Sequence, residues 1–461
     1  ASRIMSAAPE DAGARCPGPA YRDLLEADSK PVPPVLLETS GEDLGDAPLD
    51  ASRWFSEAFF ELEAERLWPR VWQMVCREEQ LPEVGDTVVY DIVGRSVLVV
   101  RSAPDRLQAF HNACLHRGRR LRDRDGNTAQ LRCPFHGFTW SLDGRLKSIP
   151  CRWDFEHLEG EDLSLPELRV DTWGGFVFVN MDPAAVPLDE YLAPLPAHFA
   201  RWSPEDCTLA AHVAQVIPCN WKVAQEAFME SYHVIATHPQ ILPVAADASS
   251  QYDTWGLHVN RNMMAFAATS PHLADAGIDE ARVVKEMLAL WGKEPPADLD
   301  PGRLGNARAW LGDRLRGAFQ GAWGGDYSGA ADAEVLDALV YNVFPNFAPW
   351  GGFAPNIVYR WRPFERDVSR CIMEVMILKR VAEDGERPPP AAVRWLADDE
   401  PWSNARELPV LGPVIDQDLA NLPHMEAGLR SLVKGKVQLG HYQERRIRHF
   451  HRALDHYLET A

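Results

Sequence analysis

The fold is decided by two short segments, Cys114-Leu-His116-Arg-Gly118 and Cys133-Pro-Phe-His136-Gly137. Each segment supplies one cysteine and one histidine and ends at a glycine. Two such loops, folded face to face, can offer two thiolates to one iron and two imidazoles to a second iron. The glycines suit this arrangement, because backbone N–H groups must come close to the sulfur atoms.

A zinc site is the main alternative for these residue types. Zinc sites of the Cys2His2 kind usually have the spacing C-x2–4-C followed by H-x3–5-H, which the alternating order in this chain does not match. A chance cluster of buried cysteines and structural histidines is the other alternative. The spacing therefore favours a [2Fe–2S] cluster held by Cys114, His116, Cys133 and His136. Histidine ligands of this kind raise the reduction potential to roughly −150 to +300 mV.

The two segments and their flanks, Phe110–Gly118 and Cys133–Gly144, resemble the cluster loops of the Rieske domain family. Cytochrome bc-type members of that family carry an additional cysteine in each loop. Arg119 and Phe135 stand at those positions in this chain, and the sequence has no apolar run of the roughly 18 residues that a membrane helix needs. The respiratory branch is thus excluded.

A second group of candidate ligands lies in the segment Asn220–Pro239. His233 and His238 are five residues apart and cannot share one face of a helix. They can converge if His233 ends a helix and His238 follows its break, which Pro239 favours. Two histidines and one carboxylate with open positions are typical of non-haem Fe(II) sites that activate O2. Two unrelated histidines are the alternative.

This second segment resembles the α subunits of ring-hydroxylating oxygenases. In that family the carboxylate ligand lies eight residues before the Gln of a Q-x-G-L motif. Glu426 replaces that Gln here, so the count leads to Asp418, with Asp416 as the second choice. An acidic turn that caps a helix is the alternative explanation for Asp418.

The resemblance also gives Glu230 a catalytic role. The family usually has an Asp at this position, which bridges a cluster histidine of one subunit to the first iron-binding histidine of its neighbour. By this resemblance Glu230 would connect His116 or His136 to His233 across the interface of a homotrimer. Glu226 lies one helical turn earlier and is expected as its structural neighbour or as part of a surface pair.

The resemblance implies an α+β fold in three parts. Residues 1–54 form an N-terminal arm with little structure of its own, residues 55–184 an antiparallel β Rieske domain, and residues 185–461 a helix-grip-like (START/SRPBCC-type) catalytic domain with mononuclear Fe(II). Residue patterns predict helices at 56–67, 221–235, 279–291, 303–319, 417–433 and 442–460. They predict strands at 87–92, 96–101, 131–133, 138–142, 175–180, 339–343, 356–361 and 370–379. Residues 268–335 form an insertion that we expect near a pocket entrance.

Composition limits the remaining possibilities. A hydrophobic fraction of 46% over 461 residues suits a globular protein of two or three domains. A formal net charge of −20 disfavours a nucleic-acid partner. The first thirty residues lack the apolar middle of a secretory signal, so a cytoplasmic location without membrane attachment is expected. Eight scattered cysteines in a chain of this size predict reduced thiols or metal ligands.

The resemblance implies the oxygenase component of a multicomponent system. Electrons would come from NAD(P)H through a flavin reductase, a ferredoxin or both. With O2, they would support cis-dihydroxylation, monohydroxylation or O/N-dealkylation of an aromatic or hydrophobic small molecule. A homotrimer is implied, possibly with a β subunit. The competing hypothesis is a Rieske electron carrier fused to a ligand-binding domain without mononuclear iron.

The substrate pocket is expected between the iron-binding segment and the strands that face it. Candidate wall residues are mostly apolar, which favours a hydrophobic substrate. Core packing is the alternative for each of them. The candidates are Phe228, Met229, Val234, Met263, Met264, Phe266, Asn342 and Phe344.

Overall fold

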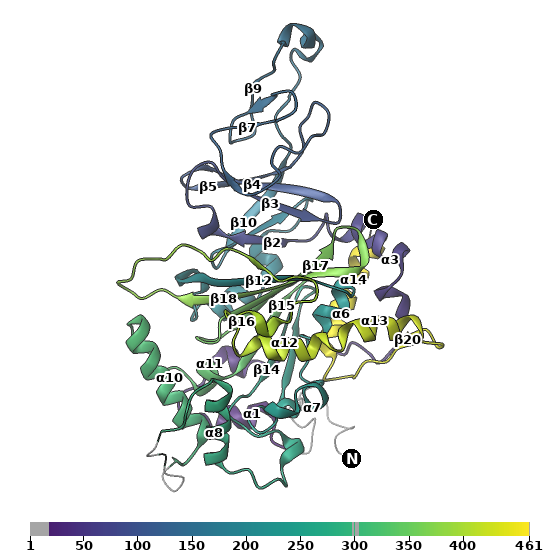
Figure 1. Ribbon diagram of the computed structural model, residues 1–461. Coiled ribbons are helices and arrows are strands. Elements are labelled where there is room, and N and C mark those ends of the chain that lie inside the picture. The colour runs from purple at the N-terminus through teal and green to yellow at the C-terminus, as the bar shows by residue number, and fades with distance from the viewer. Residues whose placement is uncertain (1–17, 297–298, 300–303, 461) are drawn as a thin grey trace.

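The computed structural model describes residues 18–296, 299 and 304–460 (Figure 1). A narrow β domain stands above a larger unit of sheet and helices. The strands β7 (Leu131–Arg132) and β9 (Leu146–Ser148) lie at the far tip of the β domain, whereas α7 (Val234–Thr237) lies near the other end of the molecule. The predicted α+β fold, an antiparallel β domain followed by a larger unit of sheet and helices, is confirmed.

The β domain is built from a seven-stranded antiparallel sheet and a small three-stranded sheet. The larger sheet has the order β2-β11-β10-β5-β4-β3-β6, and the smaller one β7-β8-β9. Leu98 and Phe110 of the large sheet pack with Leu131 and Trp140 in one buried cluster, which fixes the small sheet on its support. The remaining strands are β2 (Gln73–Arg77), β3 (Asp86–Ile92), β4 (Arg95–Ala103), β5 (Arg106–His111), β6 (Gly126–Asn127), β8 (Thr139–Trp140), β10 (Glu167–Trp173) and β11 (Phe176–Asn180).

The larger unit is organised by an eight-stranded sheet with the order β13-β14-β15-β16-β17-β18-β12-β19. Its long central pair joins β12 (Cys207–Ile217) to β18 (Asp367–Arg380), from Cys207 opposite Arg380 to Ile217 opposite Cys371. All pairings are antiparallel except that of β19 with β12. The other strands are β13 (Gln251–Trp255), β14 (Val259–Met264), β15 (Ala338–Val343), β16 (Phe347–Gly351), β17 (Ile357–Phe364) and β19 (Arg394–Trp395). A separate ribbon pairs β1 (Leu49–Asp50) with β20 (Lys436–Val437).

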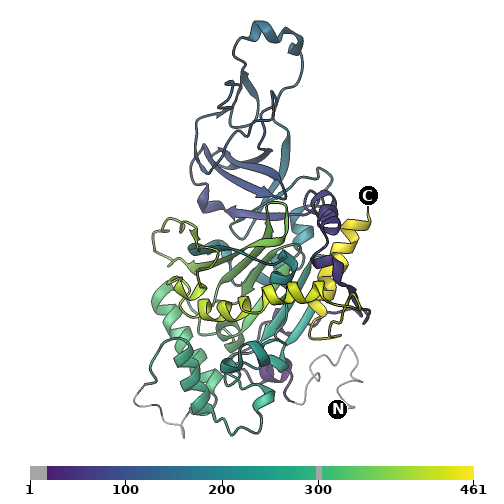
Figure 2. The same ribbon diagram turned by 45° about the vertical axis from the view of Figure 1, so that its right-hand side comes forward.

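Helices cover this sheet, and α12 (Leu411–Leu419) and α13 (Leu422–Arg430) run in line across it (Figure 2). The C-terminal helix α14 (Arg445–Glu459) packs on β13 and β14. The other helices are α1 (Tyr21–Glu26), α2 (Pro34–Leu37), α3 (Glu57–Leu62), α4 (Leu188–Leu192), α5 (Leu195–Phe199), α6 (Trp221–Glu226), α8 (Glu280–Leu290), α10 (Ala307–Trp323) and α11 (Asp332–Leu336). Within the part of the chain that is described, no helix is long and apolar enough to cross a membrane.

The single helix predicted at 221–235 is instead two short helices, α6 and α7. Side-chain hydrogen bonds occupy the backbone between them and compete with helical pairing. The Glu230 carboxylate accepts from the N–H of His233 at 2.9 Å, and the Ser231 N–H donates to the Tyr252 hydroxyl at 3.1 Å. The prediction that His233 ends a helix was therefore wrong, because His233 precedes α7 and His238 follows it.

The described part of the N-terminal arm is more structured than predicted. Tyr21 is buried and its hydroxyl donates to Asp337 at 2.9 Å. The Asp28 carboxylate accepts from the N–H groups of Asp332 and Ala333 at the start of α11. The arm thus gains its structure from contacts with the larger unit rather than from its own sequence. Residues 1–17 lie outside the described residues.

A buried ion pair connects the arm, α10 and β15, and its removal gives a test of this packing. Arg308 donates to Asp337 at 2.6 and 3.0 Å, and both side chains are buried. We expect Arg308→Ala to lower the free energy of unfolding by about 3–5 kcal/mol, because the Asp337 charge would remain buried without its partner. Arg282→Ala on α8, which removes an exposed i,i+4 pair with Glu286, should cost less than about 0.5 kcal/mol. Urea unfolding followed by tryptophan fluorescence measures both, and equal costs would contradict this account.

Candidate functional site

The two Cys–His loops have the same backbone geometry. Gly118 N–H donates to the Cys114 carbonyl at 2.9 Å, and Gly137 N–H donates to the Cys133 carbonyl at 3.0 Å. Both glycines have positive φ values, 74° and 80°, which side chains disfavour. Each loop is therefore a tight turn that carries a cysteine at its start and a histidine near its tip. The two loops meet at the end of the β domain.

The four predicted cluster residues lie together. The Cys114 and Cys133 side chains are buried and in hydrogen-bond contact, and the rings of His116 and His136 have centroids 4.6 Å apart. Burial raises the pKa of the Cys114 thiol. The backbone N–H groups of His116 and Arg117 donate to its sulfur and act in the opposite direction, lowering that pKa. N–H groups directed at sulfur stabilise a thiolate and tune iron–sulfur clusters.

The imidazole of His116 fits a metal ligand for a separate reason. Its Nδ1 atom is buried and has no hydrogen-bond partner among the described residues. The ring stacks on Phe138 with centroids 4.8 Å apart and an interplanar angle of 5°, which fixes its orientation. A buried, unpartnered imidazole nitrogen is costly unless a ligand or metal satisfies it. The donor set and this orphan atom together fit a [2Fe–2S] cluster.

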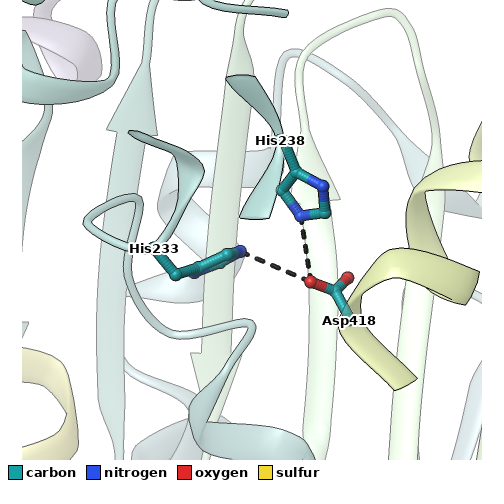
Figure 3. A group of neighbouring side chains, drawn as sticks. All are labelled: His233, His238 and Asp418. Carbon is teal, nitrogen blue, oxygen red and sulfur yellow. Dashed lines mark hydrogen bonds and ion pairs between the residues drawn. The ribbon is translucent and has the colours of Figure 1, made fainter. Parts of the chain in front are cut away.

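The second group consists of His233, His238 and Asp418 (Figure 3). One potential ligand atom from each lies within 4.8 Å of the other two. Asp418 Oδ1 is 2.9 Å from His238 Nε2 and 3.6 Å from His233 Nε2. Asp418 and His238 are buried, and His233 is partly exposed. Two imidazoles and one carboxylate that converge in this way fit a ferrous iron site with open coordination positions.

A hydrogen bond at Nδ1, the ring nitrogen that faces away from Asp418, fixes the orientation of each histidine. His233 Nδ1 lies 2.7 Å from Glu230 Oε1, and His238 Nδ1 lies 2.8 Å from Gln417 Oε1. Both rings consequently direct Nε2 toward Asp418, as metal-binding histidines are commonly held. Burial acts to lower the pKa of His233, but the hydrogen bond and charge of Glu230, with the charge of Asp418, raise it above its ordinary value. The sequence analysis missed Gln417, although it directly precedes Asp418.

Asp416, the second choice for the carboxylate ligand, has a structural role instead. It accepts from the N–H groups of Trp402 and Ser403 at 2.6 and 3.0 Å. Glu426 accepts from the N–H of Asn220 at 2.7 Å and so connects α13 to the start of α6. Glu226 is not in a surface pair, because it accepts from Trp54 Nε1 and from His451 Nε2.

A cavity of about 480 Å³ opens beside the three candidate ligands. Glu230, His233, His238 and Asp418 line it on one side, and the rest of the lining is mainly apolar. Four predicted wall residues are in the lining, namely Phe228, Val234, Met264 and Phe266. The 268–335 insertion also contributes to the cavity wall, as expected, through Met287, Leu290, Trp291, Leu315 and Val335, and Leu336 directly after it is in the lining as well.

Four other predicted wall residues lie elsewhere. Met263 is fully buried, on the opposite face of β14 from Met264, because side chains alternate along a strand. Asn342 accepts from Gln225 at 2.8 Å, and Phe344 stacks on Tyr457 of α14. Met229 is buried in a core cluster, where its carbonyl accepts from Arg446. The sequence analysis missed the aromatic wall residues Trp291, Trp350 and Tyr359, which lie on segments far from the histidines.

Two family models match the chain. The Rieske [2Fe-2S] domain matches residues 71–159, and the ring hydroxylating alpha subunit (catalytic domain) matches residues 197–460. The second match alone covers more than half of the chain.

Curated relatives align over part of their length. The carnitine monooxygenase oxygenase subunit of Escherichia coli (strain K12) is 33% identical over 183 residues, which are 39% of this chain and 49% of that protein. The biphenyl 2,3-dioxygenase subunit alpha of Rhodococcus jostii (strain RHA1) is 31% identical over 281 residues, 56% of this chain and 59% of that protein. The chain therefore spans about half the length of the curated relatives that it matches.

Solved structures share the fold over nearly the whole chain. The quaternary ammonium Rieske monooxygenase CntA in complex with L-carnitine has a TM-score of 0.63 at 19% identity, and covers 91% of this chain and 99% of that chain. Naphthalene 1,2-dioxygenase from Rhodococcus sp. bound to indole has a TM-score of 0.59 at 19% identity. The match covers 89% of this chain and 94% of that chain. This chain therefore belongs to the family of ring-hydroxylating α subunits, which combine a Rieske [2Fe–2S] domain with a catalytic domain that binds mononuclear iron.

Proposed function

We propose that this chain is the oxygenase component of a multicomponent Rieske oxygenase. It would use O2 and electrons from a reductase or ferredoxin to oxidise a small hydrophobic molecule. One observation carries the proposal: His233, His238 and Asp418 converge beside a largely apolar cavity. A reactive metal centre and a place for an apolar substrate thus share one site.

The proposed ligands are His233, His238 and Asp418 for ferrous iron and Cys114, His116, Cys133 and His136 for the cluster. When bound, the iron would supply O2 activation and the cluster would supply electrons. Around these groups the chain has three tasks. Glu230 and Gln417 orient the two imidazoles, the cavity wall limits water near the site, and the wall also positions the substrate.

A cationic side chain is missing from the described residues of the cavity wall, since none of them is Arg or Lys. A substrate with a carboxylate, such as carnitine, would meet no Arg or Lys side chain there and would lie near the carboxylates of Glu230 and Asp418. The cavity therefore favours an uncharged hydrophobic or aromatic substrate. Phe228, Phe266 and Trp350 supply aromatic surface in its wall.

We further propose a head-to-tail homotrimer. The cluster loops lie at the tip of the β domain, far from α7 of the same chain (Figure 1). That tip exposes Phe135 and Trp153, which are 59% and 74% accessible, and Tyr232 beside His233 is 53% accessible. Apolar surface at both places suits contact between neighbouring subunits. In this arrangement Glu230 would connect His233 to a cluster histidine of the neighbouring subunit.

In the alternative, an electron carrier, the chain would bind the [2Fe–2S] cluster but no mononuclear iron. A domain without iron would have no need for two imidazoles that are each held at Nδ1 and directed at one buried carboxylate. This geometry favours the oxygenase.

Replacing the carboxylate tests the mononuclear site. We expect the wild-type protein, purified anaerobically and supplied with Fe(II), to hold about three irons and two acid-labile sulfides per chain. Asp418→Ala should reduce this to about two irons with sulfide unchanged, because a site with two histidines alone binds iron weakly. Asp416→Ala should keep the third iron, since Asp416 bonds only to backbone N–H groups. A third iron retained in Asp418→Ala would exclude this ligand.

Replacing a cysteine tests the cluster. Cys133→Ser should abolish the visible absorption and the sulfide while leaving about one iron per chain, because the two metal sites share no ligand. Cys151→Ser is the matched control, since Cys151 is an exposed thiol in the same domain. Its absorption spectrum should equal that of the wild type. Loss of sulfide in both variants, or in neither, would refute the assignment of Cys133.

Mixing the two defective chains tests the trimer. Cys133→Ser has an iron site without a cluster, and Asp418→Ala has a cluster without an iron site. When the two variants are co-expressed with different tags and purified through both tags, they should form mixed trimers. Each mixed trimer should contain one contact at which the cluster of one subunit faces the iron site of the next, because a head-to-tail ring has one direction. These trimers should show a rapid O2-dependent reoxidation of the reduced cluster that neither variant shows alone. Slow reoxidation in mixed trimers would mean that electrons do not cross between subunits.

A further inference from the structure

The cavity wall contains a hydroxyl group without a hydrogen-bond partner among the described residues. Tyr359 on β17 lines the cavity and is 2% exposed, so the little surface that it keeps faces the cavity. Its hydroxyl makes no hydrogen bond with any of the described residues. The hydroxyl is not fully buried, so it reaches the open space of the cavity. A bound molecule in the cavity would provide the missing partner.

The neighbouring rings hold the phenol in one position. Phe228 and Trp361 lie with ring centroids 5.0 and 5.4 Å from that of Tyr359, and Trp350 lies at 6.3 Å. The side chain is also part of a buried core cluster. It therefore cannot swing out to find water at the surface. A donor that is fixed in this way is suited to fix the orientation of a ligand.

Three other polar groups in the wall are already used, and the Trp350 indole N–H, which has no partner among the described residues, is itself fully buried. Ser231 donates to Asn262 at 3.0 Å, Glu230 is bonded to His233, and Glu407 accepts from Arg394 at 2.8 Å. The phenol differs from them because it lies free beside the apolar part of the wall. Burial, with the nearby Asp418 charge adding to it, raises the pKa of Tyr359 well above its ordinary value. The hydroxyl therefore stays protonated at neutral pH and can donate.

We propose that Tyr359 is a substrate-binding residue whose hydroxyl donates a hydrogen bond to a neutral oxygen of an otherwise hydrophobic substrate. This inference rests on the proposed function and narrows its substrate class to molecules with a carbonyl or ether oxygen beside an apolar or aromatic body. A neutral acceptor is favoured over a carboxylate, because Asp418 and Glu230 line the same cavity and no Arg or Lys does so among its described lining residues. A site built to bond a polar group discriminates strongly against an analogue without one.

The test compares two ligands and two variants. Benzophenone and diphenylmethane share one skeleton and differ in a carbonyl against a methylene. Their affinities for the full-length protein are measured by equilibrium dialysis, for the wild type, for Tyr359→Phe and for Tyr327→Phe. Tyr327 is a matched control, because it lies outside the cavity lining and its hydroxyl makes no hydrogen bond with the described residues. Circular dichroism and iron content establish that each variant is folded and loaded.

Tyr359→Phe should weaken benzophenone roughly three- to tenfold, the range for one lost neutral hydrogen bond. Diphenylmethane should bind Tyr359→Phe as tightly as the wild type or slightly more tightly, and Tyr327→Phe should match the wild type for both ligands. An unchanged ratio of the two affinities in Tyr359→Phe would overturn the inference, and so would a wild type that does not bind benzophenone. Dialysis needs no turnover, so these outcomes are separate from those of the proposed function, which fails if the protein holds no third iron.

Discussion

The convergence of two imidazoles on one buried carboxylate is the constraint on which the catalytic unit depends. His238 and Asp418 are 180 residues apart in the chain and approach to 2.9 Å only because α7 and α12 are both held on the eight-stranded sheet. Three polar side chains beside an apolar cavity are costly to bury unless they bind something. Glu230 and Gln417 add two more hydrogen-bonding groups that orient the rings. Such an arrangement is explained by a cation at its centre.

The β domain also brings candidate metal ligands together, and it does so within a much shorter segment of the chain. Two tight turns place their cysteines and histidines together, and the small sheet β7-β8-β9 holds the second turn against the large sheet. Positive φ at Gly118 and Gly137 permits turns this tight. The two sites lie toward opposite ends of the molecule (Figure 1). This separation is the observation behind the proposal that Glu230 acts between neighbouring subunits.

The sequence predicted the sites better than the elements that carry them. The cysteine and histidine spacings are local features, so the grouping of Cys114, His116, Cys133 and His136 and the approach of His233 to His238 could be predicted without a structure. Asp418 was predicted from the family resemblance, with Asp416 as the second choice, and the structure brings Asp418 to the two histidines. Helix boundaries depend on tertiary hydrogen bonds, and the Glu230 and Ser231 contacts that divide 221–235 cannot be inferred from helical periodicity. The strands β12, β13 and β14 and the wall residue Trp350 were missed. β13 and β14 are buried along nearly their whole length and yet contain polar residues such as Asp253, Asn260 and Arg261, so their sequences show no alternation typical of a strand. Met263 and Met264 are adjacent on β14 and therefore face opposite sides of the sheet. Which of the two lines the cavity depends on the pairing register of β14, which the sequence alone does not give.

The most direct test is anomalous diffraction at the iron absorption edge from crystals grown anaerobically with Fe(II). The account predicts two neighbouring iron peaks between the loops at 114–118 and 133–137. It predicts a third, separate peak within bonding distance of His233, His238 and Asp418. Iron at the loops with nothing between these three side chains in Fe(II)-soaked crystals would reduce the protein to an electron carrier. A zinc signal at the loops, or no metal at either site, would contradict the account as a whole.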